Sequence, residues 1–479
     1  MTDPTLLVAV PLLASVVPAT LAFVRERLGW PVALATLLVQ TALAVDVAAD
    51  AVDGTPVVAD VGGVPAPFGI RLVVDPLAAP FVVLVAVAAL AVLAYTRAAG
   101  PRSGPFYSVY LLLVAGLTGV CVTADVFNLY VFLEISGIAS YALVARASGG
   151  RAAFAALQYL LVGTVGASLY LLGVGYAYVA TGTLAVAELA ATVPDADPAL
   201  VLAAFGLMAT GLGVKAALYP LHTWKPPAYD HAPAGVTALL AALVSTVAAY
   251  ALARLLLSAF TLRLFALAPF VQPALLAAAC LSILAGSVLA YREPRLTRRL
   301  AYSSVAQFGV VLVGIAVATP LGVAGAVVHL VGHAAMKAGA FLAAGVAAAR
   351  YGAATVDDYR GLAREAPYLA GGLAVLLFGL VGIPPTVGFV GKLYVALGAA
   401  RAGAWLPLAV VLGSTLTSLA YFAPVVQRMY VEGPPPERTG TDSPGMRATV
   451  AGAVAATLAL GVTAPLLERT LAPFLEVVL

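Results

Sequence analysis

Ionisable residues lie deep within strongly apolar stretches of the 479-residue sequence, where a charge is costly. Glu134 is the acid of the stretch VFNLYVFLEISGIASYALV, and Lys215 is the charge within the apolar stretch 199–219. In a low dielectric, an ammonium and a carboxylate hold each other charged, and separation favours the neutral amine. A Glu134–Lys215 pair that opens and closes would therefore release and recapture a proton. The alternative is an acid near a helix end, or one paired only for packing.

A second cluster lies in HLVGHAAMKAGAFLAAG, where His329, His333 and Lys337 are spaced four residues apart. On a helix this spacing places all three on one face. The two histidines titrate near physiological pH and can pass protons through water. The HxxxH spacing also occurs in zinc sites, but a third ligand and a carboxylate are not evident nearby. Either histidine alone can instead be a hydrogen-bonded core residue.

Two further groups of polar residues lie next to Pro-containing segments. Lys392 follows Pro384–Pro385 and is predicted to accept a proton on the far side, facing a water cavity. The alternative is a lysine that reaches the membrane interface along its own stem. The second group is predicted to form a cytoplasmic vestibule, with solvated loop charges as an equal alternative. Its members are His222, Lys225, Asp230 and His231.

The elements that position these residues are predicted to be membrane-spanning helices. The sequence is 62% hydrophobic and 10% charged, whereas soluble domains carry about 25% charged residues. The apolar runs are long enough to span a bilayer and do not alternate as in a membrane β-barrel. The fold class is therefore an all-α polytopic membrane protein. About fourteen spans are expected, at 5–24, 30–48, 75–96, 106–122, 125–145, 153–180, 199–219, 234–257, 268–290, 299–318, 321–348, 367–400, 403–427 and 446–468.

The connections between these spans predict the topology. Most of the 25 Lys and Arg residues fall in the odd-numbered connections, which places both termini outside the cell membrane by the positive-inside rule. Segment 49–74 is predicted to form a small outer hairpin, and 431–445 a polar cytoplasmic loop. The whole chain, 1–479, is predicted to be one membrane domain. Two cysteines without CxxC spacing exclude thiolate-ligated clusters, and a net charge of +3 does not indicate a nucleic-acid partner.

Two spans combine Gly, Pro and one buried lysine, at 205–226 and 377–394. Such interruptions free backbone groups, which is tolerated only against protein or a water-filled cavity. Broken helices in both halves of a chain indicate a transporter site. We therefore expect two inverted five-helix repeats, at about 106–257 and 268–427, with helices 7 and 12 broken.

Several motifs resemble the proton-translocating antiporter-like family, which includes the large membrane subunits of respiratory complex I and the A and D subunits of Mrp-type Na⁺/H⁺ antiporters. They are GLGVKAALYPLHTWKPPAYDHAPAGVTALLAAL, LAYSSVAQFG and GLVGIPPTVGFVGK, together with the histidine cluster. The resemblance implies fourteen helices beside other hydrophobic subunits. It also implies that Glu134 and Lys215 form the coupling ion pair. By the same resemblance, the histidine cluster is the central relay and Lys392 the far-side proton site.

The sequence departs from the family pattern at two positions. Where the family usually has a lysine in helix 8, this chain has Thr246 beside Ser245. Hydroxyls can hold a water wire but cannot store a charge, so both residues are relay candidates only. Lys225 stands where the family normally has leucine after a tryptophan.

The resemblance and the chain length favour a D-type subunit of a multi-subunit Na⁺/H⁺ antiporter, a secondary transporter rather than an enzyme. The chain is expected to have no cofactor or metal. The alternative is a proton-pumping membrane subunit of a complex I-like or hydrogenase-linked oxidoreductase, and a non-conducting scaffold is disfavoured. Expected partners are other hydrophobic subunits, the bilayer, protons, and Na⁺ or another monovalent cation.

Overall fold

The computed structural model describes residues 2–52, 55–66, 69–147, 149–431, 433 and 437–479. Within this part, thirteen helices are long and apolar enough to cross a membrane. The chain also contains the broken helix formed by α18 (Pro367–Val381) and α19 (Val387–Arg401). These elements confirm an all-α polytopic membrane protein, with thirteen candidate spans and one broken helix where about fourteen spans were expected.

The long helices follow the expected spans closely. They are α1 (Thr5–Ala14) continued by α2 (Val16–Ala22), α3 (Gly29–Ala51), α4 (Ala79–Ala99), α5 (Gly104–Val122), α6 (Val126–Val144), α7 (Gly150–Thr181), α9 (Pro198–Ala216), α11 (Ala234–Leu239) continued by α12 (Ser245–Arg254), α14 (Val271–Arg292), α15 (Leu296–Ala316), α16 (Pro320–Tyr351), α20 (Trp405–Tyr430) and α21 (Pro444–Val478). The last helix extends ten residues beyond the expected span.

Shorter elements connect the long helices. The π-helical turn η4 (Leu240–Val244) joins α11 to α12, and a second one, η5 (Leu255–Ala259), extends α12 within the same span. The other short helices are η1 (Glu26–Leu28), η2 (Val61–Gly63), α8 (Val186–Thr192), η3 (Val193–Asp195), α10 (Lys225–His231), α13 (Arg263–Leu267), η6 (Val356–Tyr359) and α17 (Leu362–Glu365).

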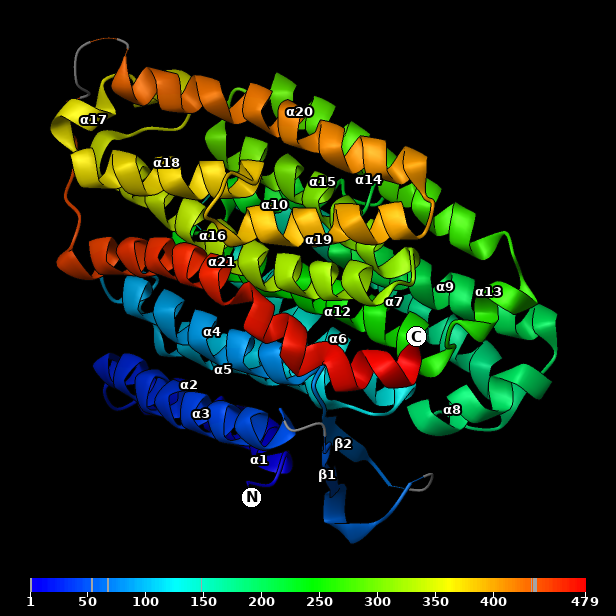
Figure 1. Cartoon of the computed structure of the whole chain (residues 1–479). Coiled ribbons are helices and arrows are strands. Elements are labelled where there is room, and N and C mark those ends of the chain that lie inside the picture. Colours follow the sequence, from blue (N-terminus) through cyan, green and yellow to red (C-terminus); the bar gives the residue numbers. More distant parts are fainter. Residues whose placement is uncertain (1, 53–54, 67–68, 148, 432, 434–436) are drawn as a thin grey trace.

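The connection between α3 and α4 forms the expected hairpin. Strands β1 (Val57–Asp60) and β2 (Arg71–Val74) pair antiparallel, with Asp60 opposite Arg71. The Arg71 side chain donates from Nε to Asp60 Oδ1 over 2.8 Å. The hairpin projects from one side of the bundle in Figure 1. Residues 53–54 and 67–68 of the predicted hairpin segment lie outside the described residues, as do 432 and 434–436 of the predicted polar loop.

Both predicted helix breaks are present. Helix α9 ends at Ala216, and the following Ala217 has a left-handed backbone with φ of 61° before the chain resumes as α10. Helix α18 ends at Val381, the following Gly382 has a φ of 93°, and α19 begins five residues after Gly382. Each break leaves carbonyl groups without helical partners within the bundle. The two inverted repeats stay a prediction.

The protein core lies around the second half of the chain. In the span from α11 to η5 the whole of an apolar 18-residue window is buried, and in α15 and α16 the corresponding shares are 94% and 89%. By contrast, only 33% of the corresponding window in α20 and 17% in α21 is buried, as expected for helices that face lipid or a neighbouring subunit. In Figure 1 the long helices lie side by side across the view, with α10 among them near the centre of the bundle.

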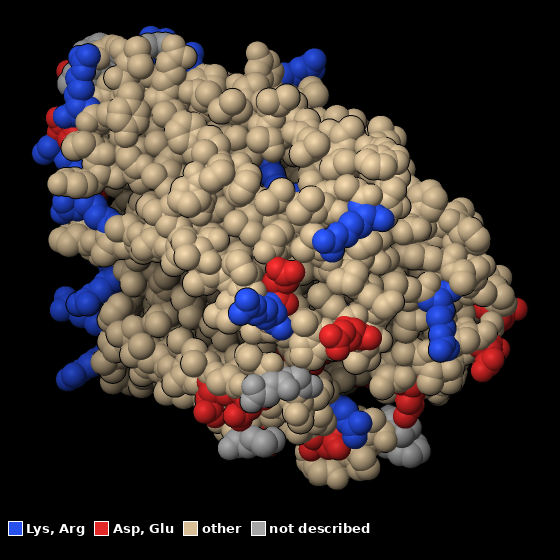
Figure 2. Space-filling view, in the orientation of Figure 1, with Lys and Arg blue, Asp and Glu red and all other residues tan. Residues whose placement is uncertain are grey.

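Basic residues gather at one end of the bundle, at the left of Figure 2. Several of them form ion pairs there across different connections. Arg350 Nη1 lies 3.3 Å from Asp442 Oδ1, and Arg428 Nε lies 2.7 Å from Asp357 Oδ1. This asymmetry in the folded protein agrees with the asymmetry along the sequence.

Candidate functional site

Glu134 and Lys215 form the ion pair expected from the sequence. Lys215, the second-last residue of α9, donates from Nζ to Glu134 Oε1 over 3.1 Å and to the Tyr141 hydroxyl over 3.0 Å. Lys215 is 4% exposed, whereas the Glu134 side chain is 22% exposed. Glu134, Gly137 and Tyr141 share one face of α6 at helical spacing. A Cβ at Gly137 would lie 2.7 Å from Lys215 Nζ, so glycine makes room for the ammonium.

Lys337 and His333 lie on α16 and are buried against α15. Lys337 Nζ donates to the Leu300 carbonyl over 2.6 Å and to the Ser303 hydroxyl. His333 is 1% exposed, and neither of its ring nitrogens has a hydrogen-bond partner among the described residues. Its ring packs edge-on against Phe308, with centroids 4.9 Å apart. A buried imidazole without partners is costly in a dry interior, so this site suits a group that bonds to transient water.

His329 and Lys392 are connected through α15 and the second helix break. His329 Nε2 lies 2.9 Å from Gln307 Oε1, and Gln307 Nε2 donates to the Leu380 carbonyl over 3.2 Å. Lys392 Nζ donates to that same carbonyl over 3.4 Å and to the Val381 carbonyl over 2.9 Å. These carbonyls are at the C-terminus of α18, where the helix dipole favours a cation. The helix break therefore supplies the hydrogen-bond acceptors of Lys392, which is 5% exposed.

The four vestibule candidates do not form one cluster. Asp230 Oδ1 accepts from Arg295 Nε over 2.9 Å, and Arg298 Nε lies 3.3 Å from Asp230 Oδ2. His231 Nε2 is 4.0 Å from the same carboxylate, while the buried His222 ring packs against Tyr219 and Tyr302. Lys225 is fully buried, and the Asp230 side chain is 2% exposed. The alternative of solvated loop charges is therefore wrong for Lys225 and Asp230.

The two hydroxyl candidates of helix 8 differ in their contacts. Ser245 Oγ donates to the Lys215 carbonyl over 3.3 Å, so it touches the helix end that carries the ion pair. Thr246 is fully buried, and its hydroxyl has no hydrogen-bond partner among the described residues. Of the two hydroxyl groups, only that of Ser245 therefore contacts the backbone of an ion-pair residue among the described residues.

Sequence reasoning missed the polar and aromatic residues that connect these charges. Gln307 forms hydrogen bonds with His329 and with the Leu380 carbonyl at the second break, and Tyr141 accepts a hydrogen bond from Lys215 as Glu134 does. The spacing of Tyr141, seven residues after Glu134, was a usable signal. Gln307 gave a weaker one, as a polar residue within an apolar span. In the part of the chain that the structure describes, no group of three His, Cys, Asp or Glu residues could hold a metal ion.

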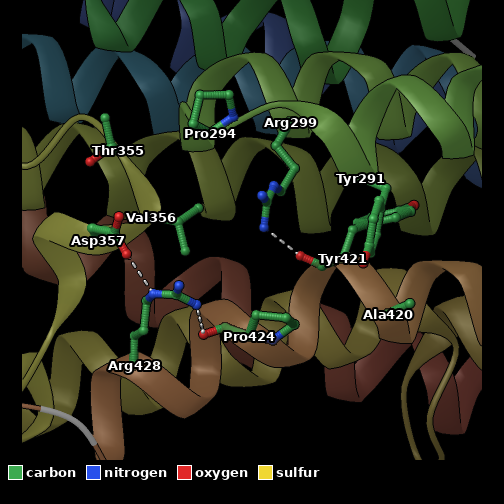
Figure 3. Close-up of a pocket in the computed structure, with 10 residues that line it drawn as sticks. All are labelled: Tyr291, Pro294, Arg299, Thr355, Val356, Asp357, Ala420, Tyr421, Pro424 and Arg428. Atoms are coloured by element: carbon green, nitrogen blue, oxygen red, sulfur yellow. Dashed lines mark hydrogen bonds and ion pairs between the residues drawn. The ribbon is translucent and has the colours of Figure 1, made fainter.

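A pocket of about 310 Å³ is lined by residues other than the predicted site residues (Figure 3). It is lined from the α14–α15 connection, η6 and α20. Arg299 points into it and donates from Nη1 to the Tyr421 carbonyl over 2.7 Å, while Arg428 pairs with Asp357. These contacts fasten α15 and η6 to α20. The pocket is therefore a junction between elements of the second half.

Buried lysines and histidines, together with the Glu134–Lys215 ion pair, inside a helical membrane bundle are typical of a multi-pass, ion-translocating membrane protein. The family described as NADH:quinone oxidoreductase/Mrp antiporter, TM, matches residues 123–418. The chain belongs to this family. It is a cation-translocating, antiporter-like membrane subunit, as the sequence resemblance implied.

Two curated relatives show the range of the family. The chain is 42% identical over 459 residues to NADH-quinone oxidoreductase subunit N of Desulforudis audaxviator, covering 93% of this chain and 88% of the relative. It is 32% identical over 362 residues to the D subunit of the Na(+)/H(+) antiporter of Bacillus subtilis, covering 75% of this chain and 73% of the relative.

Solved structures match almost the entire fold. A chain of the membrane-bound sulfane sulfur reductase, an archaeal respiratory membrane complex, is 30% identical with a TM-score of 0.92, covering 99% of this chain and 97% of that one. A chain of the Mrp complex from Dietzia sp. is 28% identical with a TM-score of 0.90 and the same coverage.

Proposed function

We propose that this chain is the proton-translocating membrane subunit of a respiratory oxidoreductase, of the type represented by subunit N. The observation that carries this proposal is the 42% identity to a subunit N over 93% of the chain. The similarity to the D-type antiporter relative is lower, and it covers 75% of the chain. In this proposal electron transfer takes place in other subunits, and this chain moves protons.

The proposed mechanism starts at the Glu134–Lys215 pair. At 3.1 Å, the carboxylate stabilises the ammonium and holds the proton on Lys215. When the pair opens, the buried ammonium loses this stabilisation, and its proton moves to a neighbouring acceptor through water. When the pair closes again, Lys215 takes up a new proton. Ser245, which touches the Lys215 carbonyl, and Thr246 are the proposed hydroxyl relay.

The remaining charges receive and release the proton in the second half. His333 and Lys337 are the proposed central relay, with His329 joined to Lys392 through Gln307 and the Leu380 carbonyl. Lys392 is the proposed far-side proton site. His222, Asp230 and His231 are proposed to form the cytoplasmic vestibule.

A D-type subunit of a Na⁺/H⁺ antiporter is the second candidate, because the fold matches the Mrp complex chain with a TM-score of 0.90. The row of buried charges would serve that function equally. A non-conducting scaffold is disfavoured, because burying three lysines in addition to an ion pair costs several kcal/mol and contributes nothing to packing.

We further propose that the chain lies in the plasma membrane with its basic end in the cytoplasm and both termini outside. The gathering of arginines at one end of the bundle supports this orientation. The exposed apolar faces of α20 and α21 are long enough to contact neighbouring hydrophobic subunits. Partner subunits are therefore part of the proposal.

The test is transport by the complete assembly, purified from its native membrane and reconstituted in liposomes. Internal pH and Na⁺ are followed with and without NADH and a quinone. Proton transport that requires the electron donor supports the subunit N proposal. Donor-independent Na⁺/H⁺ exchange supports the antiporter candidate instead, and transport in neither condition refutes both. Mass spectrometry of the co-purified subunits gives an independent answer, since redox subunits accompany the first type.

A further inference from the structure

Lys225 is a buried cation that the proposed mechanism has not used. It begins α10, is 0% exposed, and its Nζ has no hydrogen-bond partner among the described residues. Lys215, Lys337 and Lys392 each donate to two oxygen atoms. An unpaired buried ammonium is costly, and a membrane protein retains such a group chiefly for function.

The surroundings of Lys225 suit a group that changes its charge. Three aromatic rings face Nζ, with centroid distances of 4.5 Å to Phe308, 5.5 Å to Tyr229 and 5.9 Å to Trp224. Aromatic faces attract an ammonium weakly, and the same rings pack equally well around a neutral amine. Neither form is fixed by a carboxylate, unlike the ammonium of Lys215. The site can therefore hold Lys225 with or without its proton.

Lys225 also lies between the two groups of charges. On one side, Tyr141 bonds to Lys215 and packs against Tyr159 at 4.6 Å, and Tyr159 stacks on Trp224 at 4.0 Å. Trp224 is the residue before Lys225, and its Nε1 donates to the Val214 carbonyl over 2.9 Å. This contact anchors α10 against the last turn of α9, so Lys225 has a fixed position relative to the ion pair.

On its other side, Lys225 faces the relay of the second half. The Phe308 ring that contacts Lys225 Nζ also packs against His333, at 4.5 Å and 4.9 Å respectively. Lys225 is close enough to His333 and Lys337 to interact with both electrostatically. In the first half, the ring stack of Tyr141, Tyr159 and Trp224 connects Lys225 to the Lys215–Glu134 pair, and His222 also interacts with Lys225 electrostatically.

We infer that Lys225 is a further proton-carrying residue, which connects the Glu134–Lys215 pair to His333 and Lys337. A new N–H bond forms at Nζ when water delivers the proton that Lys215 has released, and the amine becomes an ammonium. The bond breaks when the proton passes to His333 or Lys337, and Nζ returns to the amine. The ring of Phe308 packs against both Lys225 and His333, so its movement would change the access of water between them. This inference rests on the proposed proton-translocating function.

The experiment compares three variants of the complete reconstituted assembly: Lys225→Met, Lys225→Arg and Lys215→Met. Arg401→Met is the matched control, because it removes an exposed cation at the end of α19. We expect Lys225→Met to keep or raise the thermal unfolding midpoint, because it removes an unpaired charge. Its proton transport should fall about tenfold or more, since a proton-transfer group typically contributes at least that factor. Arginine keeps the charge but does not release a proton, so Lys225→Arg should fall similarly.

The outcomes separate this inference from the proposed function. Wild-type transport in Lys225→Met, with Lys215→Met inactive, overturns the role of Lys225 alone. Wild-type transport in Lys225→Arg shows a fixed charge rather than a proton carrier, and also overturns it. Wild-type transport in both Lys225→Met and Lys215→Met refutes the proposed function itself. If Lys225→Met does not assemble, Lys225→Gln is judged by the same transport criterion.

Discussion

Replacing Glu134 by Gln should separate the charge of the ion pair from its hydrogen bond. Glutamine keeps the shape and the acceptor oxygen but leaves the Lys215 ammonium without a counter-charge. At 3.1 Å, two unit charges in an effective dielectric of about 20 interact by about 5 kcal/mol. The Glu134 side chain is 22% exposed, so water replaces part of this interaction. Breaking a buried pair typically costs about 3–5 kcal/mol, and we expect the lower end here.

This loss should appear in both stability and transport. We expect a lower thermal unfolding midpoint of the assembly for Glu134→Gln. If the full 3 kcal/mol or so raises the barrier to proton uptake, transport falls about a hundredfold, since about 1.4 kcal/mol corresponds to tenfold. The double variant Glu134→Gln/Lys215→Met removes both charges, so it should recover the midpoint but not the transport.

Transport in liposomes, measured from internal pH at equal assembly content, is the deciding assay. A rate within about twofold of wild type for Glu134→Gln, with an unchanged midpoint, would refute the reasoning. A double variant that transports normally would show that neither charge carries protons.

Three further predictions concern packing and surface charges. A Cβ at Gly391 would lie 2.8 Å from the Cα of His329, so Gly391→Val should separate α19 from α16, at a cost of about 1–3 kcal/mol, and lower the unfolding midpoint. An unchanged midpoint would contradict this close packing. Asp230→Asn removes the partner of two arginines that are 41% and 35% exposed, so the midpoint should fall by the equivalent of about 1–2 kcal/mol. A gain in stability would show that the carboxylate is poorly compensated. Burial raises the pKa of Asp358, but backbone N–H donors at 354 and 355 and the Thr355 hydroxyl outweigh it and lower that pKa below 3.8. A depressed pKa stabilises the fold above the unfolded value, so Asp358→Asn should destabilise at pH 7, and the difference should shrink below about pH 4.

Most of the helical spans could be predicted from the sequence, because apolar runs and the distribution of basic residues are patterns that are visible along the chain. The two helix breaks were also predictable, since Gly and Pro next to a buried lysine make an uninterrupted span unfavourable. The pairing of Glu134 with Lys215 followed from the scarcity of deep charges. Each has few other partners in the first half.

Other contacts join segments that are far apart in the sequence, so no local sequence pattern predicts them. Arg254, at the end of α12, binds Asp75 through two contacts of 2.6 Å across 179 residues. Asp230 meets its arginines only when the α14–α15 connection folds over α10. Lys225 adjoins prolines and therefore read as a loop residue, although tertiary packing buries it completely.

The depth of the proposed proton-carrying residues within the bundle determines how the membrane voltage acts on them. Glu134 lies midway along α6, Lys337 midway along α16, and Lys215 and Lys392 lie at helix breaks. In the proposed function, a proton passed from Glu134 towards Lys337 would start and finish near the middle of a spanning helix, so it would cross little of the voltage. The membrane potential delivers about 2.3 kcal/mol per charge per 100 mV only to steps that change depth. Voltage should thus act mainly on the steps by which a proton enters and leaves this group of residues.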